Sequence, residues 1–180
     1  MLKPNKARGR ALSRGFTLSE TLVTVSIIGV LSAVAVPEYT RQKEFSCQKP
    51  IEAQLSTLLS QAQAYNDEFG TGPNSWKELD KIATVMTATG PAISNDFNWI
   101  ETPACNYKVK ANKEGNKYTF IATQKGAFPL APEDSNEGID PQKNTYNVVA
   151  CVNVATGASD ISRGDGKTAT SPSDLTCGAS

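Results

Sequence analysis

The sequence predicts an α+β fold in which a long amino-terminal helix packs on an antiparallel β-sheet. An apolar run begins at residue 16, and apolar residues then recur at helical spacing to about residue 68. After a turn region the chain changes to segments rich in β-branched and aromatic residues, separated by turn signals. A chain of 180 residues with both patterns fits one modest domain and an anchoring segment.

The first element is an uncharged run from residue 16 to 36 that Glu20 alone interrupts. As an α-helix, its 21 residues would span about 31 Å, close to the thickness of one bilayer core. Serine and threonine side chains are scattered through it; such hydroxyls can bond to carbonyls of their own helix and suit close helix contacts. A carboxylate in such a run costs free energy, so Glu20 indicates a function.

Charge is divided unevenly along the chain. Residues 1–15 carry five basic residues and no acid, and the remainder carries 13 basic and 18 acidic residues, so charges of +5 and −5 cancel. A basic flank keeps its side of a membrane segment in the cytoplasm, so we expect the bulk of the chain on the other side. The acidic remainder gives no sign of general affinity for nucleic acid.

Four cysteines follow the apolar run and would share an oxidising compartment: Cys47, Cys105, Cys151 and Cys177. Their even number and wide spacing suggest two disulfides with three possible pairings, and buried free thiols are the alternative. The sequence has no histidine and no CxxC pair, which argues against zinc and removes histidine-dependent nucleophilic catalysis. We therefore expect no enzymatic activity, no metal site and no cofactor.

Three interpretations of the amino-terminal segment compete. A plain membrane anchor explains the length of the run but not Glu20. A secretory signal peptide would be cut after Ala35 in Ala33-Val34-Ala35, yet the run is longer than a usual signal core and contains an acid. The third interpretation rests on Gly15-Phe16-Thr17-Leu18-Ser19-Glu20 behind the basic leader, which resembles the processing site of type IV prepilins.

In the prepilin family, a dedicated peptidase cuts after the glycine and methylates the new amino terminus. The resemblance therefore implies cleavage between Gly15 and Phe16 and an N-methylated amine on Phe16. It also implies that Glu20 of an incoming subunit neutralises the Phe16 amine of its neighbour, because an unpaired buried ion is strongly disfavoured.

Gly29 and Pro37 stand where the family often has a glycine and a helix-kinking proline. We expect them to make the helix flexible, and a simple kink at the membrane exit is the alternative. The resemblance covers about residues 9–40, with Ser19 where an aliphatic residue is usual. It divides the chain into a cleaved basic leader (1–15), a hydrophobic transmembrane and assembly helix (16–37) and an exported globular domain (38–180).

The exported domain is expected to continue the helix, with an apolar stripe from Ile51 to Phe69 that ends at Gly70-Thr71-Gly72-Pro73. Pro50 is expected to kink this helix or to start a new turn. Ser75-Trp76-Lys77-Glu78 is a capping-box pattern for a short helix with Trp76, Leu79, Ile82, Ala83 and Met86 facing inward. Strands are predicted at residues 97–101, 105–111, 117–123 and 146–155, with a hairpin turn at 112–116.

Two segments after residue 125 are predicted to lie largely at the surface of the domain. Residues 126–144 combine prolines with four acids and are predicted to be a solvated loop, with calcium binding as the alternative. Residues 155–180 would fray unless tied down, and Arg163-Gly164-Asp165 is interpreted as an ordinary turn, not an adhesion motif. In pilins a disulfide bounding the carboxy-terminal region is common, so the resemblance implies Cys151–Cys177, which leaves Cys47–Cys105.

The resemblance implies a structural subunit, a minor pilin, of an extracellular type IV pilus-like filament. Its partners would be other pilin subunits, the prepilin peptidase and the inner-membrane pilus assembly machinery, and its precursor would sit in the bacterial inner membrane. The alternatives are a pseudopilin of a type II secretion system and a secreted binding module cut after Ala35. Nucleic-acid contact would depend on a lysine cluster for which a solvated hairpin is the simpler interpretation, namely Lys108, Lys110, Lys113 and Lys117.

Overall fold

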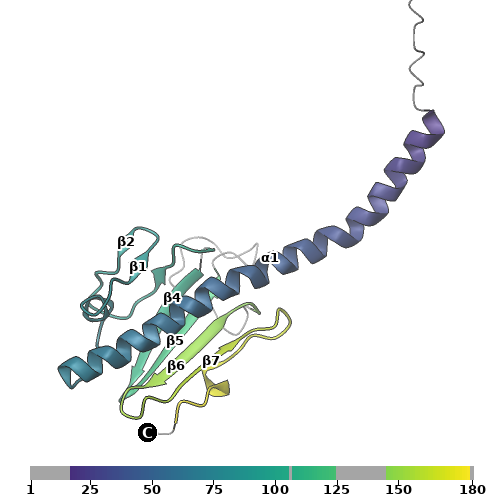
Figure 1. Cartoon of the computed structure of the whole chain (residues 1–180). Helices are drawn as coiled ribbons and strands as arrows, with labels where there is room; N and C mark the ends of the chain where they lie inside the picture. The colour runs from purple at the N-terminus through teal and green to yellow at the C-terminus, as the bar shows by residue number, and fades with distance from the viewer. Residues whose placement is uncertain (1–16, 106, 125–144, 179–180) are drawn as a thin grey trace, which may run out of the picture. The chain divides into compact units, whose positions relative to one another are not determined.

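The computed structural model describes residues 17–105, 107–124 and 145–178 (Figure 1). The chain divides into two units, Met1–Thr40 and Arg41–Ser180, called here the amino-terminal unit and the globular unit. The leader predicted at residues 1–15, Phe16 and the whole loop predicted at residues 126–144 lie outside the described residues.

One helix contributes to both units. Helix α1 runs from Leu18 to Phe69, which confirms the long helix predicted between residues 16 and 68. It continues through Pro37 and Pro50, although each proline removes one backbone donor from the hydrogen-bond ladder. The new turn considered at Pro50 is therefore not formed.

The second half of α1 supplies one wall of the hydrophobic core. The residues of its predicted stripe are buried almost completely, with the exception of Phe69, which is 47% exposed. The Phe69 ring instead lies 4.5 Å from the ring of Tyr65, and Lys81 Nζ lies 5.8 Å from its centroid. The buried stripe consists of Ile51, Leu55, Leu58, Leu59, Ala62 and Tyr65.

The short helix after Ser75 is shorter than predicted. Helix α2 covers only Trp76–Leu79, and Ser75 caps it by accepting a hydrogen bond from the Glu78 N–H. The chain leaves the helix at Asp80, whose carboxylate accepts a bond of 3.0 Å from the Val85 N–H. The prediction that Ala83 and Met86 face inward is wrong: both are exposed, and Val85 is buried in their place.

Within the described residues, the strands form one two-stranded and one five-stranded antiparallel sheet. The larger sheet has the order β3-β4-β5-β6-β7, so each strand pairs with its neighbour in sequence. The predicted strand at 97–101 shrinks to two residues, and the predicted hairpin turn narrows to Gly115 and Asn116, where Gly115 has a φ of 59°. The strands are β1 (Met86–Thr87), β2 (Gly90–Pro91), β3 (Ile100–Glu101), β4 (Tyr107–Glu114), β5 (Lys117–Gln124), β6 (Val148–Asn153) and β7 (Ser159–Arg163).

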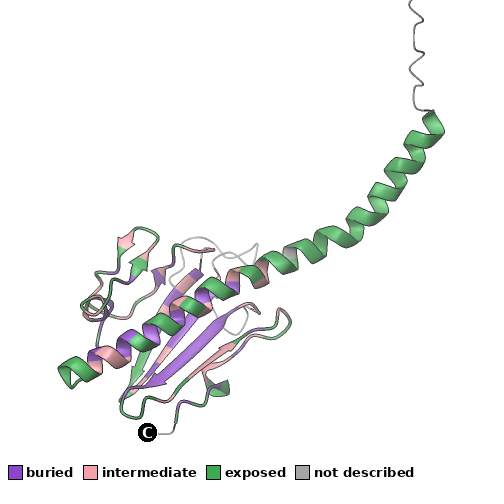
Figure 2. Cartoon of the chain, in the orientation of Figure 1, coloured by how far each residue is buried: buried purple, intermediate pink, exposed green. Residues whose placement is uncertain are grey.

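The sheet is covered on both faces, and Figure 2 shows how completely β6 is buried. Alternate side chains of β4, β5 and β6 pack against the α1 stripe, among them Val109, Phe120 and Ala150. The opposite face carries a second cluster in which Ile121, Val149 and Cys151 contact Leu175 and Cys177. The carboxy-terminal segment therefore lies over the sheet as a third layer.

The tail is ordered by pairing that the sequence analysis did not predict. Strand β7 pairs with β6 from Val148↔Arg163 to Val152↔Ser159. A short 3₁₀ helix, Pro172–Asp174, follows, with Ser171 and Asp174 forming a reciprocal capping box. The Asp160 carboxylate accepts bonds of 2.9 and 3.1 Å from the backbone and hydroxyl of Thr176, which ties the tail to β7.

Candidate assembly site on the amino-terminal helix

Helix α1 begins with a reciprocal pair of bonds between Thr17 and Glu20. The Thr17 N–H donates to Glu20 Oε2 at 2.8 Å, and the Glu20 N–H donates to Thr17 Oγ1 at 3.3 Å. The Thr17 hydroxyl also donates to Glu20 Oε2 at 2.7 Å. This arrangement is a capping box, and it places the only carboxylate of the apolar run at the positive end of the helix macrodipole.

Thr17 is a residue of the site that the sequence analysis missed. The signal was present, because Thr17-Leu18-Ser19-Glu20 is a T-x-x-E pattern at the start of an apolar run. Glu20 is thus not an isolated charge in α1. It is held in one orientation by backbone and hydroxyl donors three residues earlier.

Three hydroxyl side chains along the run bond to carbonyls of their own helix. Thr21, Thr24 and Ser26 each donate to the carbonyl four residues earlier, at 3.2, 2.7 and 2.8 Å. Because these bonds use the helix's own acceptors, the hydroxyls enter an apolar environment without an unmet donor. This confirms the expectation that they bond back to their own carbonyls.

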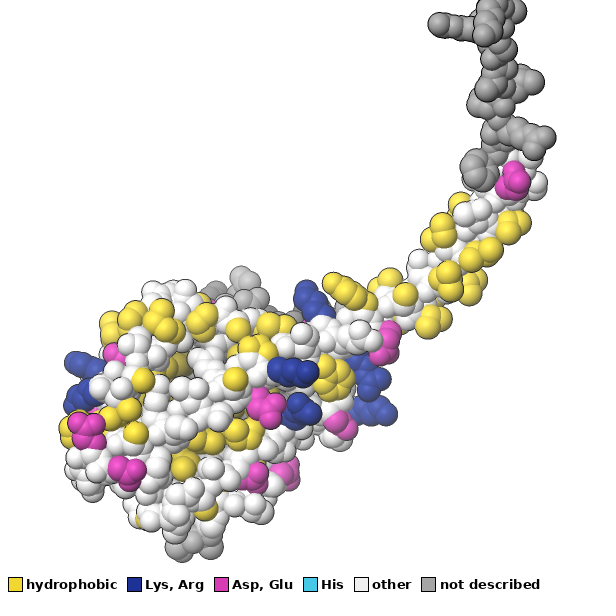
Figure 3. All heavy atoms as spheres, viewed as in Figure 1, with side chains coloured by type: hydrophobic (Ala, Val, Ile, Leu, Met, Phe, Trp, Pro, Cys, Tyr) yellow, Lys and Arg dark blue, Asp and Glu magenta, His cyan; other side chains and the backbone are white. Residues whose placement is uncertain are grey.

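The apolar side chains of this segment are exposed, and α1 is long and apolar enough to cross a membrane. Figure 3 shows them as yellow side chains following the helix. Such a large exposed apolar surface on one helix is typical of a segment that contacts lipid or other protein chains. The exposed residues include Leu18, Leu22, Val23, Val25, Ile27, Ile28, Val30, Leu31, Val34 and Val36.

The remaining predicted site residues fall in different places. Gly15 and Phe16, the residues of the expected cleavage, lie outside the described residues. Gly29 lies inside α1, and a methyl group added there would meet nothing within 4 Å. Pro37 lies near the end of the same unit, also inside α1. The role of Gly29 and Pro37 in flexibility stays a prediction.

Two disulfides join the cysteines of the globular unit. Cys47 of α1 bonds to Cys105, and Cys151 of β6 bonds to Cys177, with Cα–Cα distances of 5.7 and 6.0 Å. These are the two pairs expected from the resemblance to pilins. The first ties α1 to the segment before β4, and the second holds the carboxy-terminal layer on the outer face of the sheet.

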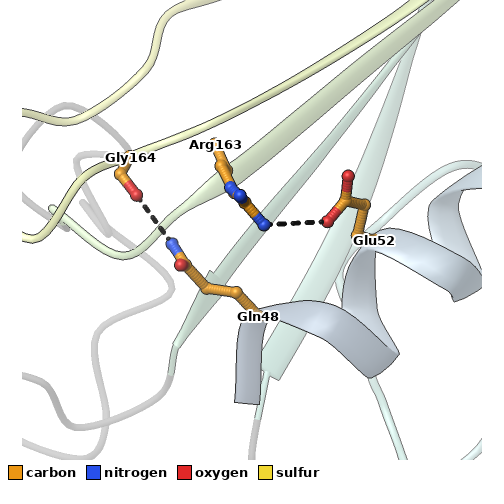
Figure 4. Close-up of polar contacts among 4 residues, drawn as sticks. All are labelled: Gln48, Glu52, Arg163 and Gly164. Atoms are coloured by element: carbon orange, nitrogen blue, oxygen red, sulfur yellow. Dashed lines mark hydrogen bonds and ion pairs between the residues drawn. The ribbon is translucent and has the colours of Figure 1, made fainter. Parts of the chain in front are cut away.

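Residues of the Arg163-Gly164-Asp165 tripeptide make contacts with other parts of the same chain (Figure 4). Arg163 Nη1 lies 3.4 Å from Glu52 Oε2, and the buried Gln48 donates from Nε2 to the Gly164 carbonyl at 2.9 Å. Asp165 Oδ1 accepts from the N–H groups of the turn that follows, and these bonds lower the pKa of Asp165 from 3.8 to about 2. The tripeptide therefore acts as a structural turn that ties β7 to α1.

Two of the four lysines considered for nucleic-acid contact are held by neighbouring groups. Lys113 Nζ donates to the Gly72 carbonyl and to Asn74 Oδ1, at 3.1 and 2.7 Å, and it lies 5.4 Å from the ring centroid of Tyr118. Lys108 lies 3.8 Å from the Glu101 carboxylate. With two of the four held by neighbours, the geometry favours a structural hairpin over a nucleic-acid surface.

The amino-terminal segment matches a known family model. Residues 10–36 match the family described as the prokaryotic N-terminal methylation motif. The chain is 30% identical over 94 residues to the type IV major fimbrial protein FimA of Dichelobacter nodosus, an alignment covering 48% of this chain and 54% of FimA. It is 33% identical over 67 residues to the competence protein ComGC of Halalkalibacterium halodurans, covering 37% of this chain and 66% of ComGC.

A third relative aligns over more of the chain. It is the type II secretion system core protein G of Vibrio cholerae, 24% identical over 140 residues, with 74% of this chain and 92% of that protein covered. The chain spans only 54% and 66% of the lengths of FimA and ComGC, and no solved structure matches it. The methylation motif, the apolar helix and these relatives support a type IV pilin-like family for this chain.

Proposed function

We propose that this chain is a structural subunit, a minor pilin, of an extracellular type IV pilus-like filament. The observation that carries the proposal is the placement of Glu20 at the first turn of an exposed apolar helix inside the methylation motif. Such a helix suits two environments in succession: the bilayer before assembly and the interior of a helical bundle afterwards. Processing by a prepilin peptidase after Gly15 would make Phe16 the amino terminus.

Cleavage changes the charge at the start of the helix. It creates a cationic amine on Phe16, next to the Thr17–Glu20 capping box. In a fibre interior, this amine needs an anionic partner, because unpaired buried ions are strongly disfavoured. We infer that Glu20 of one subunit provides it for the next, while Thr17 holds the carboxylate in one orientation at the first turn of the helix.

The family is structural, and we propose that this chain likewise has no enzymatic role. Its partners are other pilin subunits, the prepilin peptidase and the inner-membrane assembly machinery. The precursor sits in the bacterial inner membrane with its basic leader in the cytoplasm, and the processed chain enters the pilus. The charge of +5 on residues 1–15 supports this orientation.

A second candidate function is that of a pseudopilin in a type II secretion system. It is favoured by the alignment with core protein G, which covers more of both chains than those with FimA and ComGC. Both functions share the same amino-terminal chemistry. They differ in the fibre that carries the chain.

The test is to purify surface fibres from the native cells and to identify this chain in them by mass spectrometry. We expect a substoichiometric amount, as for a minor subunit, and none from cells that lack the pilus assembly machinery. A chain whose abundance in the fibre depends on the secretion machinery instead would support the pseudopilin. Recovery of the chain only as a soluble secreted protein would contradict both and support a module released after Ala35.

A further inference from the structure

A groove of about 530 Å³ lies in the globular unit between the second half of α1 and strand β7. Among the described strands, β7 has a neighbour on one side only, so the groove lies along an open sheet edge. The buried side chains of Leu59 and Val152 also line it. Its polar lining comes from Ser56, Ser60, Gln63 and Asp67 of α1 and from Ser159 and Asp160 of β7.

The groove is acidic, and none of the described residues that line it is basic. Asp67 is exposed, and hydrogen bonds from Thr176 lower the pKa of Asp160, which favours the ionised form of that carboxylate. Asp67 and Glu68 also occupy the last turn of α1, which contains no basic residue. Acids there oppose the helix macrodipole, so these charges do not serve the stability of α1 itself.

The complementary charge lies at the other end of α1 within the same unit. Residues 41–49 carry Arg41, Lys43 and Lys49 against Glu44 alone, a net charge of +2, and the three basic side chains are exposed. Lys49 and Asp67 are 18 residues apart on a continuous helix, a separation of about 27 Å. That distance is about three Debye lengths at physiological salt, so the two ends do not neutralise each other within one chain.

We propose that the groove between α1 and β7 receives the basic segment 41–49 of a second copy of this chain. Because the two surfaces differ and lie at opposite ends of the part of α1 that belongs to the globular unit, the contact is heterologous and leaves one groove and one basic segment open at each step. Heterologous contacts that do not close into a ring generate open helical filaments, so copies of this chain would lie next to one another even in a fibre made mostly of other subunits. The inference rests on the proposed function, to which it adds a defined contact between copies.

The first test is zero-length carbodiimide cross-linking of fibres that contain this chain, followed by mass spectrometry. This chemistry joins a lysine amine to a carboxylate only when the two are in contact. We expect cross-linked peptides that connect Lys43 or Lys49 to Asp67, and within one chain the helix keeps these residues about 27 Å apart or more. Fibres without this chain would overturn the proposed function. Fibres with the chain in which Asp67 links only to a lysine of another protein, or not at all, would overturn the groove assignment alone.

The second test is a charge exchange in the full chain. Asp67→Lys and Lys43→Glu should each lower the amount of the chain in fibres by about fivefold, the size expected for exposed charge pairs. The double variant D67K/K43E should restore incorporation, because the attraction is re-formed with the signs exchanged. Glu114→Lys, the same change of charge on the exposed β4–β5 hairpin, is the matched control and should have no effect. A double variant no better than either single one would contradict the contact.

Discussion

At Glu20 the structure separates two roles that the sequence presents as one. The carboxylate caps its own helix through Thr17, and it is the proposed partner of a neighbouring Phe16 amine. Capping needs an oxygen acceptor, whereas pairing with an amine inside a fibre needs the negative charge. The amide of glutamine supplies the first without the second.

We therefore predict that Glu20→Gln and Glu20→Ala are equally poor in fibre incorporation, although Glu20→Gln retains the acceptor for the Thr17 N–H. Both variants should be exported and folded, which near-ultraviolet circular dichroism of the detergent-solubilised chain would verify. Quantitative mass spectrometry of purified fibres gives the incorporation. Normal incorporation of Glu20→Gln would show that capping, not charge, is the function of this residue.

Asp165 makes the stability of the turn depend on pH. Its pKa is lowered from 3.8 to about 2 by donors from Thr168 and Lys167, so the unfolded chain takes up this proton at a higher pH than the folded chain. The stabilisation is therefore complete above about pH 4 and is lost as the pH falls toward 2. Below that range both states carry the proton.

The expected outcome is a smaller loss of stability between pH 4 and 2 in Asp165→Asn than in the wild-type chain. Thr168→Val, which removes the hydroxyl donor at 3.0 Å but keeps both backbone donors, should give an intermediate slope. Chemical unfolding of the full chain in detergent at several pH values measures the slopes. Identical slopes in all three chains would contradict the assigned bonds.

Among the elements, the connection between α1 and β7 depends on close backbone contact at Gly164. A Cβ atom there would collide with the Thr145 carbonyl and come within 2.9 Å of the Thr168 oxygen. Gln48, which is buried, reaches the same glycine from the helix. The neighbouring Arg163–Glu52 pair is exposed, at 55% and 41% of its side-chain surfaces.

Gly164→Ala should accordingly lower the free energy of unfolding by about 1–3 kcal/mol, the usual cost of overpacking. Arg163→Ala, at the adjacent residue, is the matched control. It should lower the free energy of unfolding by less than about 1 kcal/mol, because exposed ion pairs contribute little. Denaturant unfolding of both full-length variants provides the comparison. A larger loss in Arg163→Ala than in Gly164→Ala would mean that the ion pair, not the backbone contact, holds β7 to the helix.

Elements with a strong local pattern could be predicted from the sequence. The apolar stripe of α1 has a clear helical period, and β4 and β5 alternate across a turn that contains Gly115. The end of α2 could not be predicted, because the Asp80 side chain bonds to Val85 and redirects the chain. Strand β7 has a polar sequence, and only its pairing with the buried β6 makes it a strand.

The residues of the candidate site likewise include some that could be predicted from the sequence and some that could not. Glu20 stands out because a single charge interrupts an apolar run, whereas Thr17 is one hydroxyl among several and its role appears only in the geometry of the first turn. The tripeptide at 163–165 could be interpreted from the sequence, because Asp165-Gly166 is an ordinary turn signal. Its contacts with Gln48 and Glu52 agree with that structural role.

At the scale of the whole molecule, the globular unit is a three-layer structure closed by two disulfides. The Cys151–Cys177 bond spans 26 residues and holds the carboxy-terminal layer against Ile121, Val149 and Leu175. Under the chain-entropy relation, a loop of this length stabilises the folded state by about 3.5 kcal/mol. The core beneath α1 does not include this pair.

Replacing both cysteines by alanine should lower the free energy of unfolding by about that amount. Hydrogen exchange should rise first in residues 170–178, while the α1 stripe keeps its protection. Peptide mapping without reduction must show Cys47–Cys105 and Cys151–Cys177 in the wild-type chain. A Cys47–Cys177 link would contradict this arrangement of the layers.

The central claim is that the apolar helix becomes an assembly element when the leader is removed. It is tested most directly by mass spectrometry of the amino-terminal peptide of the chain taken from fibres or membranes of the native cells. We predict a chain that begins at Phe16 and carries a methyl group on its α-amine, with Glu20 four residues behind it. A mature chain that begins at Val36, or one that retains Met1–Gly15 in the fibre, would contradict the claim.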